Sequence, residues 1–423
     1  MSNTNLKNRI DVIKHDTEEP FVGIKSDGED PQVYFPLGYN LSENDDEIRR
    51  DILQLFAILN DFKNTDEGSI TENKYQETVN TDFPIYAYME IIRFYLENGY
   101  YYEVEPVYKT GERGNINWSK TIKQQQPLLS SNSKSSTYSP VYTKFTVKLP
   151  TPDENKEITK IHQHCVRVSF ERIGWIFTSF MPIKPEDKLN KERSLALLHY
   201  KLVNTNNDNK KRLFKAMIEM IESIDEEESN NQFHFGVKKF AKIWEGLIEE
   251  VFGTEDKTEY YPRANWILNG KIHETNQPLQ PDSIMHPKDS DNYFVLDAKY
   301  YRYGDSKYPE HLPQNTDINK QITYAEFLEI NKRISSDNIY NAFLIPFNME
   351  NKGISSSNSP FINIGEAVSK WRKNNKRYDY IQGILVDTKF LMNSYKSNSA
   401  ANIMKLAKAI EDSYENNSFY RNE

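Results

Sequence analysis

Cysteine is almost absent from this 423-residue chain, which contains Cys165 alone. A single thiol excludes a disulfide framework and a zinc site built mainly on thiolates. Long apolar runs are also missing, because the nearest candidate, residues 173–183, is interrupted by Thr178 and Ser179 and is shorter than the roughly 18 residues of a membrane span. The N-terminus is charged where a signal peptide has its apolar core. We therefore expect a cytoplasmic protein that neither enters nor crosses a membrane.

The chain does not lack material for a hydrophobic core. Hydrophobic residues make up 37% of it and aromatic residues 13%, including 27 Tyr and 22 Phe, which excludes disorder of the whole chain. The net charge of -9 argues against a protein that coats nucleic acid by neutralising phosphates. It leaves open an enzyme that holds DNA in one local groove, because acidic residues around a metal site contribute to the same total.

The patterns along the chain predict a mixed α/β protein in three regions. These are an N-terminal α+β region over 1–155, a helical connector over 156–232 and a mixed α/β domain over 233–423. In the first region, the polar stretch 130–137 separates two β-rich stretches. It predicts a hairpin or an extended arm within residues 100–150.

Hydrophobic periodicity predicts the individual elements. Helices are expected over 45–62, 84–97, 234–252, 317–334 and 399–414, with a helical pattern across 160–230 broken near 205–211. Strands are expected over 101–108, 258–263, 265–272, 280–286, 293–300, 339–346 and 379–387.

Two of these strands carry the most informative residues. The segments 280–285 and 293–300 flank a short polar turn and predict a hairpin. With its centre between Asp289 and Ser290, Ile284 faces Val295 and Asp282 faces Asp297. Facing side chains lie about 4.5–5.5 Å apart at Cβ, which is close enough for two carboxylates to share one cation.

This hairpin has the parts required for phosphodiester hydrolysis. The carboxylates of Asp282 and Asp297 are the oxygen ligands that Mg²⁺ prefers. Lys299 follows on the same face of the strand, where it can orient or help deprotonate the attacking water and stabilise charge on a phosphate. The alternative is a solvated strand face, since Asp-x-Lys and Pro-Asp are common. The apolar residues before Asp297 favour the functional interpretation, because burial of Asp297 and Lys299 is costly without a partner or metal.

Pro281-Asp282, followed after a gap by Asp297-Ala298-Lys299, resembles the PD-(D/E)xK signature of restriction endonucleases and related DNA enzymes. The resemblance implies a central mixed sheet flanked by helices, preceded by a helix that often carries a further acid for the metal site. Glu245 matches that acid, and a surface position is the alternative. Gln321 and Tyr324 resemble a Gln–Tyr helix motif of RecB-type members. We expect these two residues either to contact DNA or the surroundings of the metal, or to have ordinary roles on the helix surface and in the core.

The N-terminal half resembles a narrower group. Residues 114–122 are similar to a Gly-x-Ile-x-Trp-x-x-Thr-Ile element of McrC, with Gly114, Asn117, Trp118 and Thr121 at its defining positions. The layout and the segment 244–249 resemble the LlaJI restriction endonuclease family, which is McrC-related. Asn117 stands where the element usually has an acid, so a charge-dependent role there is in doubt.

The resemblance implies a Mg²⁺-dependent, type II/IV-like restriction endodeoxyribonuclease that cleaves double-stranded DNA with an McrB-like AAA+ GTPase partner, docked through the arm at 100–150. The chain has no P-loop motif, because Gly270-Lys271 is followed by Ile272, so GTP is expected to act through the partner. Two alternatives remain. One is a catalytically silent adaptor that stimulates the GTPase, and the other is a nuclease that acts alone in repair.

Several weaker features are also explained by ordinary structural roles. His162, His164 and Cys165 lie close in sequence, but nothing nearby completes a zinc-site spacing, so packing is favoured. His286 is either a DNA contact or an exposed turn residue. The basic runs 210–212 and 372–377 contact phosphates or are solvated faces.

Overall fold

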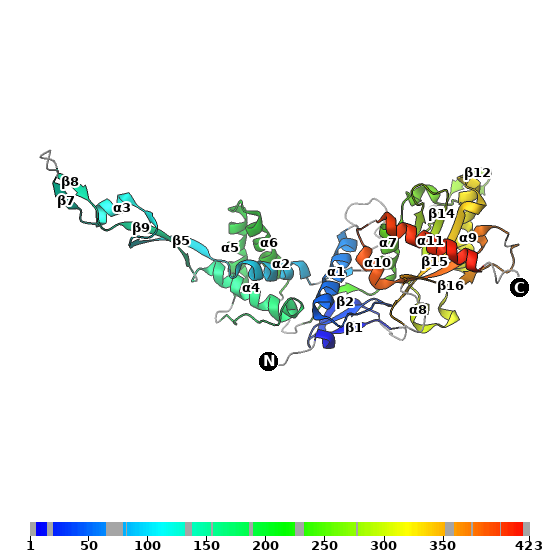
Figure 1. Cartoon of the computed structure of the whole chain (residues 1–423), viewed down its shortest axis with the longest axis horizontal. Coiled ribbons are helices and arrows are strands. Elements are labelled where there is room, and N and C mark those ends of the chain that lie inside the picture. Colours follow the sequence, from blue (N-terminus) through cyan, green and yellow to red (C-terminus); the bar gives the residue numbers. More distant parts are fainter. Residues whose placement is uncertain are drawn as a thin grey trace. The chain divides into compact units, whose positions relative to one another are not determined.

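Helices and strands are mixed throughout the described part of the chain, as the sequence predicted. The computed structural model describes residues 6–14, 20–64, 79–81, 83–131, 138–153, 155–185, 189–224, 232–275, 278–351, 359–373, 375–397 and 399–417. The larger of two compact units comprises Met1–Phe83 and Asn230–Glu423, and the smaller unit comprises Pro84–Ser229 (Figure 1). This division differs from the expected one, which placed its boundaries near residues 155 and 232.

The first sheet of the larger unit explains that difference. Its strand order is β1-β3-β2-β10-β4. Its strands are β1 (Ile10–Val12), β2 (Val22–Asp27), β3 (Gln32–Phe35), β4 (Val79–Thr81) and β10 (Gln232–Val237). β10 pairs antiparallel with both β2 and β4, so the chain after the smaller unit returns between strands formed before it.

The second sheet of the larger unit has the order β13-β14-β15-β17-β16. Its strands are β13 (Ser283–Met285), β14 (Tyr293–Ala298), β15 (Ile339–Phe347), β16 (Phe361–Ala367) and β17 (Ile381–Asp387). β14, β15 and β17 are parallel, and the two outer strands are antiparallel to their neighbours. The sheet is therefore mixed, as predicted for residues 233–423.

Helices cover both faces of this second sheet. Ile322 of α9 (Asn315–Asn331) packs in one buried cluster with Val295 and Phe343. Tyr340, which points to the other side of β15, packs edge-on against Tyr414 of α11 (Ala400–Asn417). The other helical elements of this unit are η1 (Leu6–Arg9), α1 (Asp45–Asn64), α7 (Ala241–Phe252), η4 (Lys257–Tyr260), α8 (Tyr303–Ser306), η5 (Pro309–His311), η6 (Ser336–Asn338), η7 (Arg377–Asp379) and α10 (Thr388–Ser394).

The smaller unit combines packed helices with an arm. Its helical elements are α2 (Ile85–Asn98), α4 (Glu157–Ile173), η3 (Gly174–Ile176), α5 (Lys191–Val203) and α6 (Asp208–Glu222). The arm contains β5 (Glu103–Thr110), β6 (Asn115–Ile116), α3 (Trp118–Gln124), β7 (Leu128–Ser131), β8 (Tyr138–Val141) and β9 (Thr146–Asp153). Figure 1 shows it extending away from the unit's helices. β5 pairs with β9 and β7 with β8, as the predicted hairpin requires, while residues 132–137 lie outside the described residues.

Three predicted elements are wrong in detail. The strand expected over 258–263 is replaced at its start by η4, and the helix expected over 234–252 begins only at Ala241, after β10. The strand expected over 265–272 is a hairpin of β11 (Asn265–Leu268) and β12 (Lys271–Glu274), because Asn269 and Gly270 adopt positive φ and reverse the chain. In the part of the chain that the structure describes, no helix has the length and apolar character to span a bilayer.

Candidate active site

The predicted hairpin forms with the expected register. Ile284 faces Val295 and Met285 faces Phe294 across β13 and β14. Asp282 lies one residue before β13, and its Oδ2 accepts a hydrogen bond of 2.8 Å from the backbone N–H of Ala298. This bond places the carboxylate of Asp282 at the end of β14 that carries Asp297.

The carboxyl group of Asp297 is buried and that of Asp282 is half-buried, and both lie in an electrostatically unfavourable place. Burial, and after it the charge of Glu245 on α7, raises the pKa of Asp282 to about 6. Burial, and after it the charge of Asp282, raises the pKa of Asp297 to about 7. Both shifts have the same direction, because neither carboxylate is well solvated and each repels the other. The structure therefore brings Asp282 and Asp297 together, and it places Glu245 near enough for its charge to raise the pKa of Asp282.

Lys299 supplies positive charge beside these acids. Its Nζ lies 2.7 Å from Oδ2 of Asp297 and 3.2 Å from Oδ1 of Asp317. Burial by itself lowers the pKa of Lys299, but the adjacent carboxylates outweigh burial and raise it above its ordinary value. The ammonium group therefore stays protonated at neutral pH. This favours an orienting and charge-stabilising role over proton abstraction from water.

Gln321 and Tyr324 of α9 are both buried, and each fixes the backbone near one acid. Gln321 Nε2 donates to the carbonyl oxygen of Val295 at 2.6 Å, two residues before Asp297. Tyr324 Oη donates to the carbonyl oxygen of Gln280 at 3.0 Å, two residues before Asp282. These buried contacts to backbone carbonyls favour ordinary core roles for Gln321 and Tyr324 over contact with DNA or the surroundings of a metal.

Two further charged residues belong to the site. Asp317, near the start of α9, completes a capping box with Gln314 and also pairs with Lys299. Lys257 Nζ donates to the carbonyl oxygen of Asp282 at 2.9 Å. The sequence contains a helix-start signal at Asp317 but nothing that relates it to Lys299. No sequence motif marks Lys257, because its contact with Asp282 depends on where the η4 turn places it.

The metal-binding capacity of this site rests on its donor chemistry. Asp282, Asp297 and Glu245 are all-oxygen donors, and a cation would relieve the repulsion that raises the pKa of the first two. Among the described residues, no group of three or more His, Cys, Asp or Glu side chains is gathered closely enough to hold a metal ion. The residues present fit an ion that takes few protein ligands and keeps several waters.

The residues of the 114–122 element divide into two kinds. Gly114 has a φ of +120°, and a Cβ there would lie 2.9 Å from a methyl carbon of Leu149. Asn117 caps α3 by accepting from the Lys120 backbone N–H at 3.0 Å, as an acid at that position would. Thr121 is buried, and its hydroxyl oxygen accepts from the Thr146 N–H at 2.9 Å. These three residues build the arm.

The other members of the element face solvent. The exposed fractions of Ile116, Trp118 and Ile122 are 39%, 54% and 59%. Trp118 contacts the ring of Phe145 edge-on, which fixes its orientation. The arm also exposes further apolar side chains at Leu128, Leu129 and Val141. The arm therefore exposes several large apolar side chains on a scaffold held by buried polar contacts.

The weaker candidates from the sequence have structural roles. His162 is fully buried in the smaller unit and accepts at Nδ1 from the Tyr101 N–H at 2.8 Å, and Cys165 is buried in the same core. Burial lowers the pKa of His162 to about 3. His286 stacks on Tyr293 at 4.0 Å between ring centroids. In the second basic run, Lys376 pairs with Glu329 of α9 at 2.6 Å.

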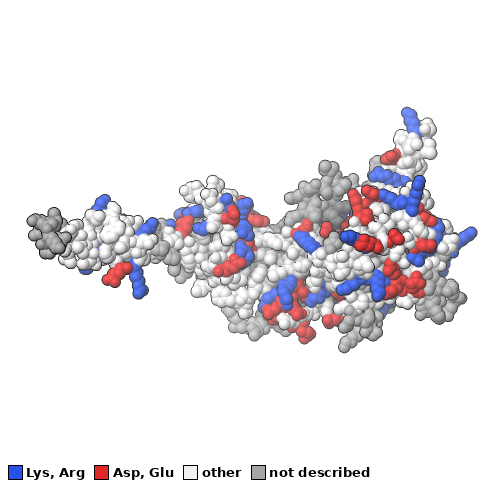
Figure 2. Space-filling model, turned by 45° about the horizontal axis from the view of Figure 1, so that its top comes forward, with Lys and Arg blue, Asp and Glu red and all other residues white. Residues whose placement is uncertain are grey.

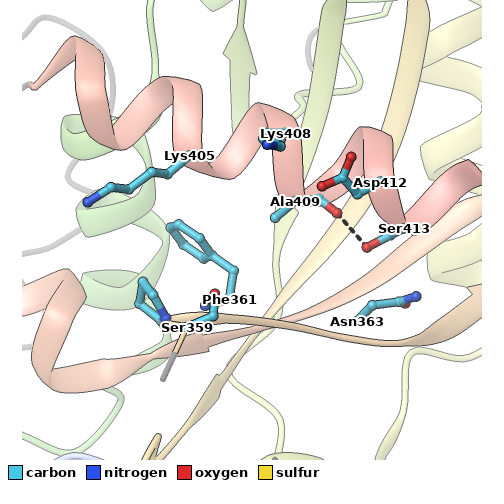
Figure 3. A pocket seen from close by; sticks show the side chains of 9 residues that line it. Ser359, Phe361, Asn363, Lys405, Lys408, Ala409, Asp412 and Ser413 are labelled. Atoms are coloured by element: carbon cyan, nitrogen blue, oxygen red, sulfur yellow. Dashed lines mark hydrogen bonds between the residues drawn. The ribbon is translucent and has the colours of Figure 1, made fainter. Parts of the chain in front are cut away.

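A separate cavity lies between β16 and α11, with a volume of about 320 Å³ (Figure 3). Phe361 of β16 and Lys405, Lys408 and Asp412 of α11 are among its lining residues. None of the acids of the hairpin lines this cavity. On the face seen in Figure 2, basic and acidic side chains are interspersed rather than gathered by sign.

The model of the LlaJI restriction endonuclease family matches residues 21–375 of the sequence. This chain belongs to the LlaJI restriction endonuclease family. The matched range includes the candidate acids, Lys299 and the whole arm. The resemblance of the sequence to the LlaJI family is thereby confirmed.

Two further comparisons concern individual proteins. The chain is 28% identical over 268 residues to the type II restriction enzyme BsuMI component YdjA of Bacillus subtilis (strain 168), and the match covers 59% of this chain. It covers 55% of YdjA, so the chain spans about half the length of that relative. Among solved structures, the chain is similar to one from the assembly of Thermococcus gammatolerans McrB AAA+ hexamers with bound McrC. The match covers 89% of this chain and 81% of that chain, at 15% sequence identity and a TM-score of 0.33. A structural similarity this low does not bear on function.

Proposed function

We propose that this chain is the DNA-cleaving subunit of a multi-component, McrBC/LlaJI-type restriction system, with a Mg²⁺-dependent PD-(D/E)xK site in residues 233–423. The observation that carries the proposal is the convergence of Asp282, Asp297 and Lys299 at one end of the β13–β14 hairpin. Membership of the LlaJI family supports the activity, and the YdjA relative is likewise a restriction enzyme component.

Each residue of the site has a distinct task in this proposal. Asp282 and Asp297 would hold Mg²⁺, with Glu245 in support. When bound, the ion lowers the pKa of a coordinated water and polarises the phosphoryl oxygen. Lys299 favours the ionised form of Asp297 through their 2.7 Å contact and offers positive charge to a phosphate that gains negative charge. Gln321 and Tyr324 hold the two backbone segments in register, which keeps the acids in place.

We propose that the partner is an McrB-like AAA+ GTPase that docks on the arm of the smaller unit. The exposed side chains of Ile116, Trp118 and Ile122 would supply the apolar contacts, while Gly114, Asn117 and Thr121 hold the arm in shape. Several large apolar side chains exposed on one small element are typical of an interaction surface. The chain has no P-loop motif, so nucleotide hydrolysis would be the partner's contribution.

The deciding experiment is DNA cleavage by the purified chain, alone and with the NTPase encoded beside it, in the presence of Mg²⁺ and GTP. We expect cleavage in the complete mixture, its loss with EDTA, and a loss of at least about a hundredfold with Lys299→Ala. Undiminished cleavage by Lys299→Ala would remove the hairpin from the active site. If the wild type stimulates GTP hydrolysis but never cuts, the chain is an adaptor instead.

A further inference from the structure

The β11–β12 hairpin exposes large apolar side chains at the edge of the larger unit. Its strands pair with each other and with no other described strand. Trp266, Ile267 and Ile272 are 66%, 72% and 69% exposed. A two-stranded ribbon of this kind is marginally stable alone, and apolar exposure on this scale indicates a surface that contacts another molecule.

The register of the hairpin separates its side chains into two faces of different character. Trp266 faces His273, and Leu268 faces Lys271, so these four residues share one face. One face therefore combines an aromatic ring and an aliphatic side chain with a cation and an imidazole. The other face carries the remaining four residues, namely Asn265, Ile267, Ile272 and Glu274.

The base of the hairpin adjoins the candidate active site. The Leu279 N–H donates to the carbonyl oxygen of Pro262 at 3.0 Å and closes the base of the ribbon. The next residue, Gln280, is held by Tyr324, and Asp282 follows two positions later. The hairpin is the narrow projection at the upper right of Figure 2, with a basic side chain at its tip and an acidic one nearer its base. A substrate bound at Asp282 and Asp297 would therefore lie beside this ribbon.

We propose that the face formed by Trp266, Leu268, Lys271 and His273 binds duplex DNA next to the bond that is cleaved. This inference rests on the proposed nuclease function. A two-stranded β-ribbon has the width of the major groove. Lys271 and His273 would contact phosphates, and the flat ring of Trp266 would pack against sugars or base edges.

Charge favours DNA over a second copy of this chain as the occupant. A symmetric contact between two copies of this face would bring Lys271 of one copy towards the same cationic face of the other. The phosphate backbone of DNA instead complements that charge. The opposite face carries Glu274 and two isoleucines and has no such complementarity with DNA.

The test is equilibrium binding of a fluorescein-labelled duplex to the full chain in EDTA, followed by anisotropy over a range of salt concentrations. Trp266→Thr is expected to weaken binding about tenfold. Lys271→Gln is expected to weaken it and to reduce the slope of log affinity against log salt by about 1. The matched control is Ile272→Thr, which introduces the same strand-compatible residue on the opposite face and is expected to bind as the wild type does.

Three outcomes overturn the proposal. Wild-type affinity in both Trp266→Thr and Lys271→Gln excludes this face from DNA binding. Equal weakening in Ile272→Thr shows a general effect of the ribbon rather than of one face. A dimeric wild type that becomes monomeric with Trp266→Thr, at unchanged DNA affinity in light-scattering and anisotropy measurements, assigns the face to a second copy.

Failure of the nuclease proposal is distinguishable from failure of this one. Asp297→Asn is expected to abolish cleavage in Mg²⁺ while it retains duplex affinity in EDTA. Retained cleavage by Asp297→Asn defeats the assigned active site but leaves the binding result for Trp266 standing. Trp266→Phe provides a rescue, since it keeps an aromatic ring and is expected to bind more tightly than Trp266→Thr.

Discussion

The backbone N–H of Ala298 donates to Oδ2 of Asp282 at 2.8 Å and thereby connects the two halves of the candidate site. Ala298 follows Asp297 directly, so the bond fixes one acid relative to the strand that carries the other. The energetic cost of this arrangement is visible in the raised pKa of both carboxyl groups. A fold that maintains two such acids side by side is consistent with a site whose charge is balanced by a bound cation.

Substitution of Asp297 separates catalysis from folding. Asp297→Asn keeps the size of the side chain and removes a charge that the fold disfavours, while Lys299 keeps its contact with Asp317, so we expect cleavage to disappear while thermal stability in EDTA is retained or increased. Cleavage assays and thermal unfolding of the same preparations test both parts. Asp289→Asn is the control, because Asp289 is exposed in the turn of the same hairpin, has a φ of 65° that Asn tolerates, and is not expected to affect cleavage.

The raised pKa values of Asp282 and Asp297 give stability a particular pH dependence. An unfolded Asp titrates near 3.9, whereas these groups titrate at about 6 and about 7 in the folded chain. The folded state therefore binds protons more tightly, and the contribution of the pair to the free energy of unfolding falls as the pH rises from about 4 to about 7. Above that range the unfavourable contribution is fully present.

Thermal unfolding in EDTA between pH 5 and pH 8 measures this effect as the difference between wild type and Asp297→Asn. We expect the variant to lose less stability than the wild type as the pH rises, since it lacks one of the two acids. Mg²⁺ is expected to stabilise the wild type more at pH 8 than at pH 5, because protons compete with the ion for the carboxylates. Identical pH profiles for the two proteins would contradict the assigned titration.

Exposed residues of the arm are predicted to determine binding to the partner and not the stability of the fold. Trp118→Ala combined with Ile122→Ala removes two exposed apolar side chains, so we expect at least about a tenfold weaker complex with the GTPase and unchanged thermal stability. Pull-down with a titrated partner and GTP turnover report the two consequences. Tyr200→Ala serves as the control, because Tyr200 is an aromatic residue on α5 of the same unit that is 63% exposed and lies outside the arm. Loss of binding in both proteins would contradict docking through the arm.

Gly246 is predicted to be essential for the packing of α7 on α1. A Cβ at position 246 would lie 2.2 Å from a ring carbon of Phe62, so Gly246→Ala must displace that ring. We expect a loss of about 1–3 kcal/mol in the free energy of unfolding, measured by chemical denaturation. The double variant Gly246→Ala/Phe62→Leu is expected to recover part of the loss, since it removes the opposing ring. Gly111→Ala is the control, because its new Cβ would meet only a methyl carbon of Val147, at 3.7 Å.

The hairpin of the candidate site could be predicted from sequence because all of its determinants are local. The polar turn between β13 and β14 sets the register, and extending that register by one residue beyond β13 places Asp282 opposite Asp297. Lys299 follows from the two-residue period of a strand. Asp317 and Lys257 could not be predicted in the same way, because their contacts depend on how α9 and η4 approach the hairpin.

The arrangement of the first sheet was beyond prediction for a different reason. Phe233, Phe235 and Val237 alternate as a strand requires, but the apolar stripe of α7 follows at once, so the pattern over 234–252 predicts one continuous helix. Nothing near β10 indicates that its partners lie in residues 22–27 and 79–81, since such pairing depends on the folded chain as a whole. The same limit explains why the compact units differ from the three regions expected from the sequence.

The return of the chain through β10 has a mechanical consequence. The smaller unit is inserted between β4 and β10, and these two strands pair antiparallel as neighbours, with Phe235 opposite Thr81. A tensile load applied to the inserted unit would therefore enter the larger unit at one strand pair and pull its two members apart from the same end. Antiparallel strands loaded in that way break their hydrogen bonds one after another. Along the chain, the β4–β10 pair is thus the first structural element of the larger unit to which a force on the arm would be transmitted.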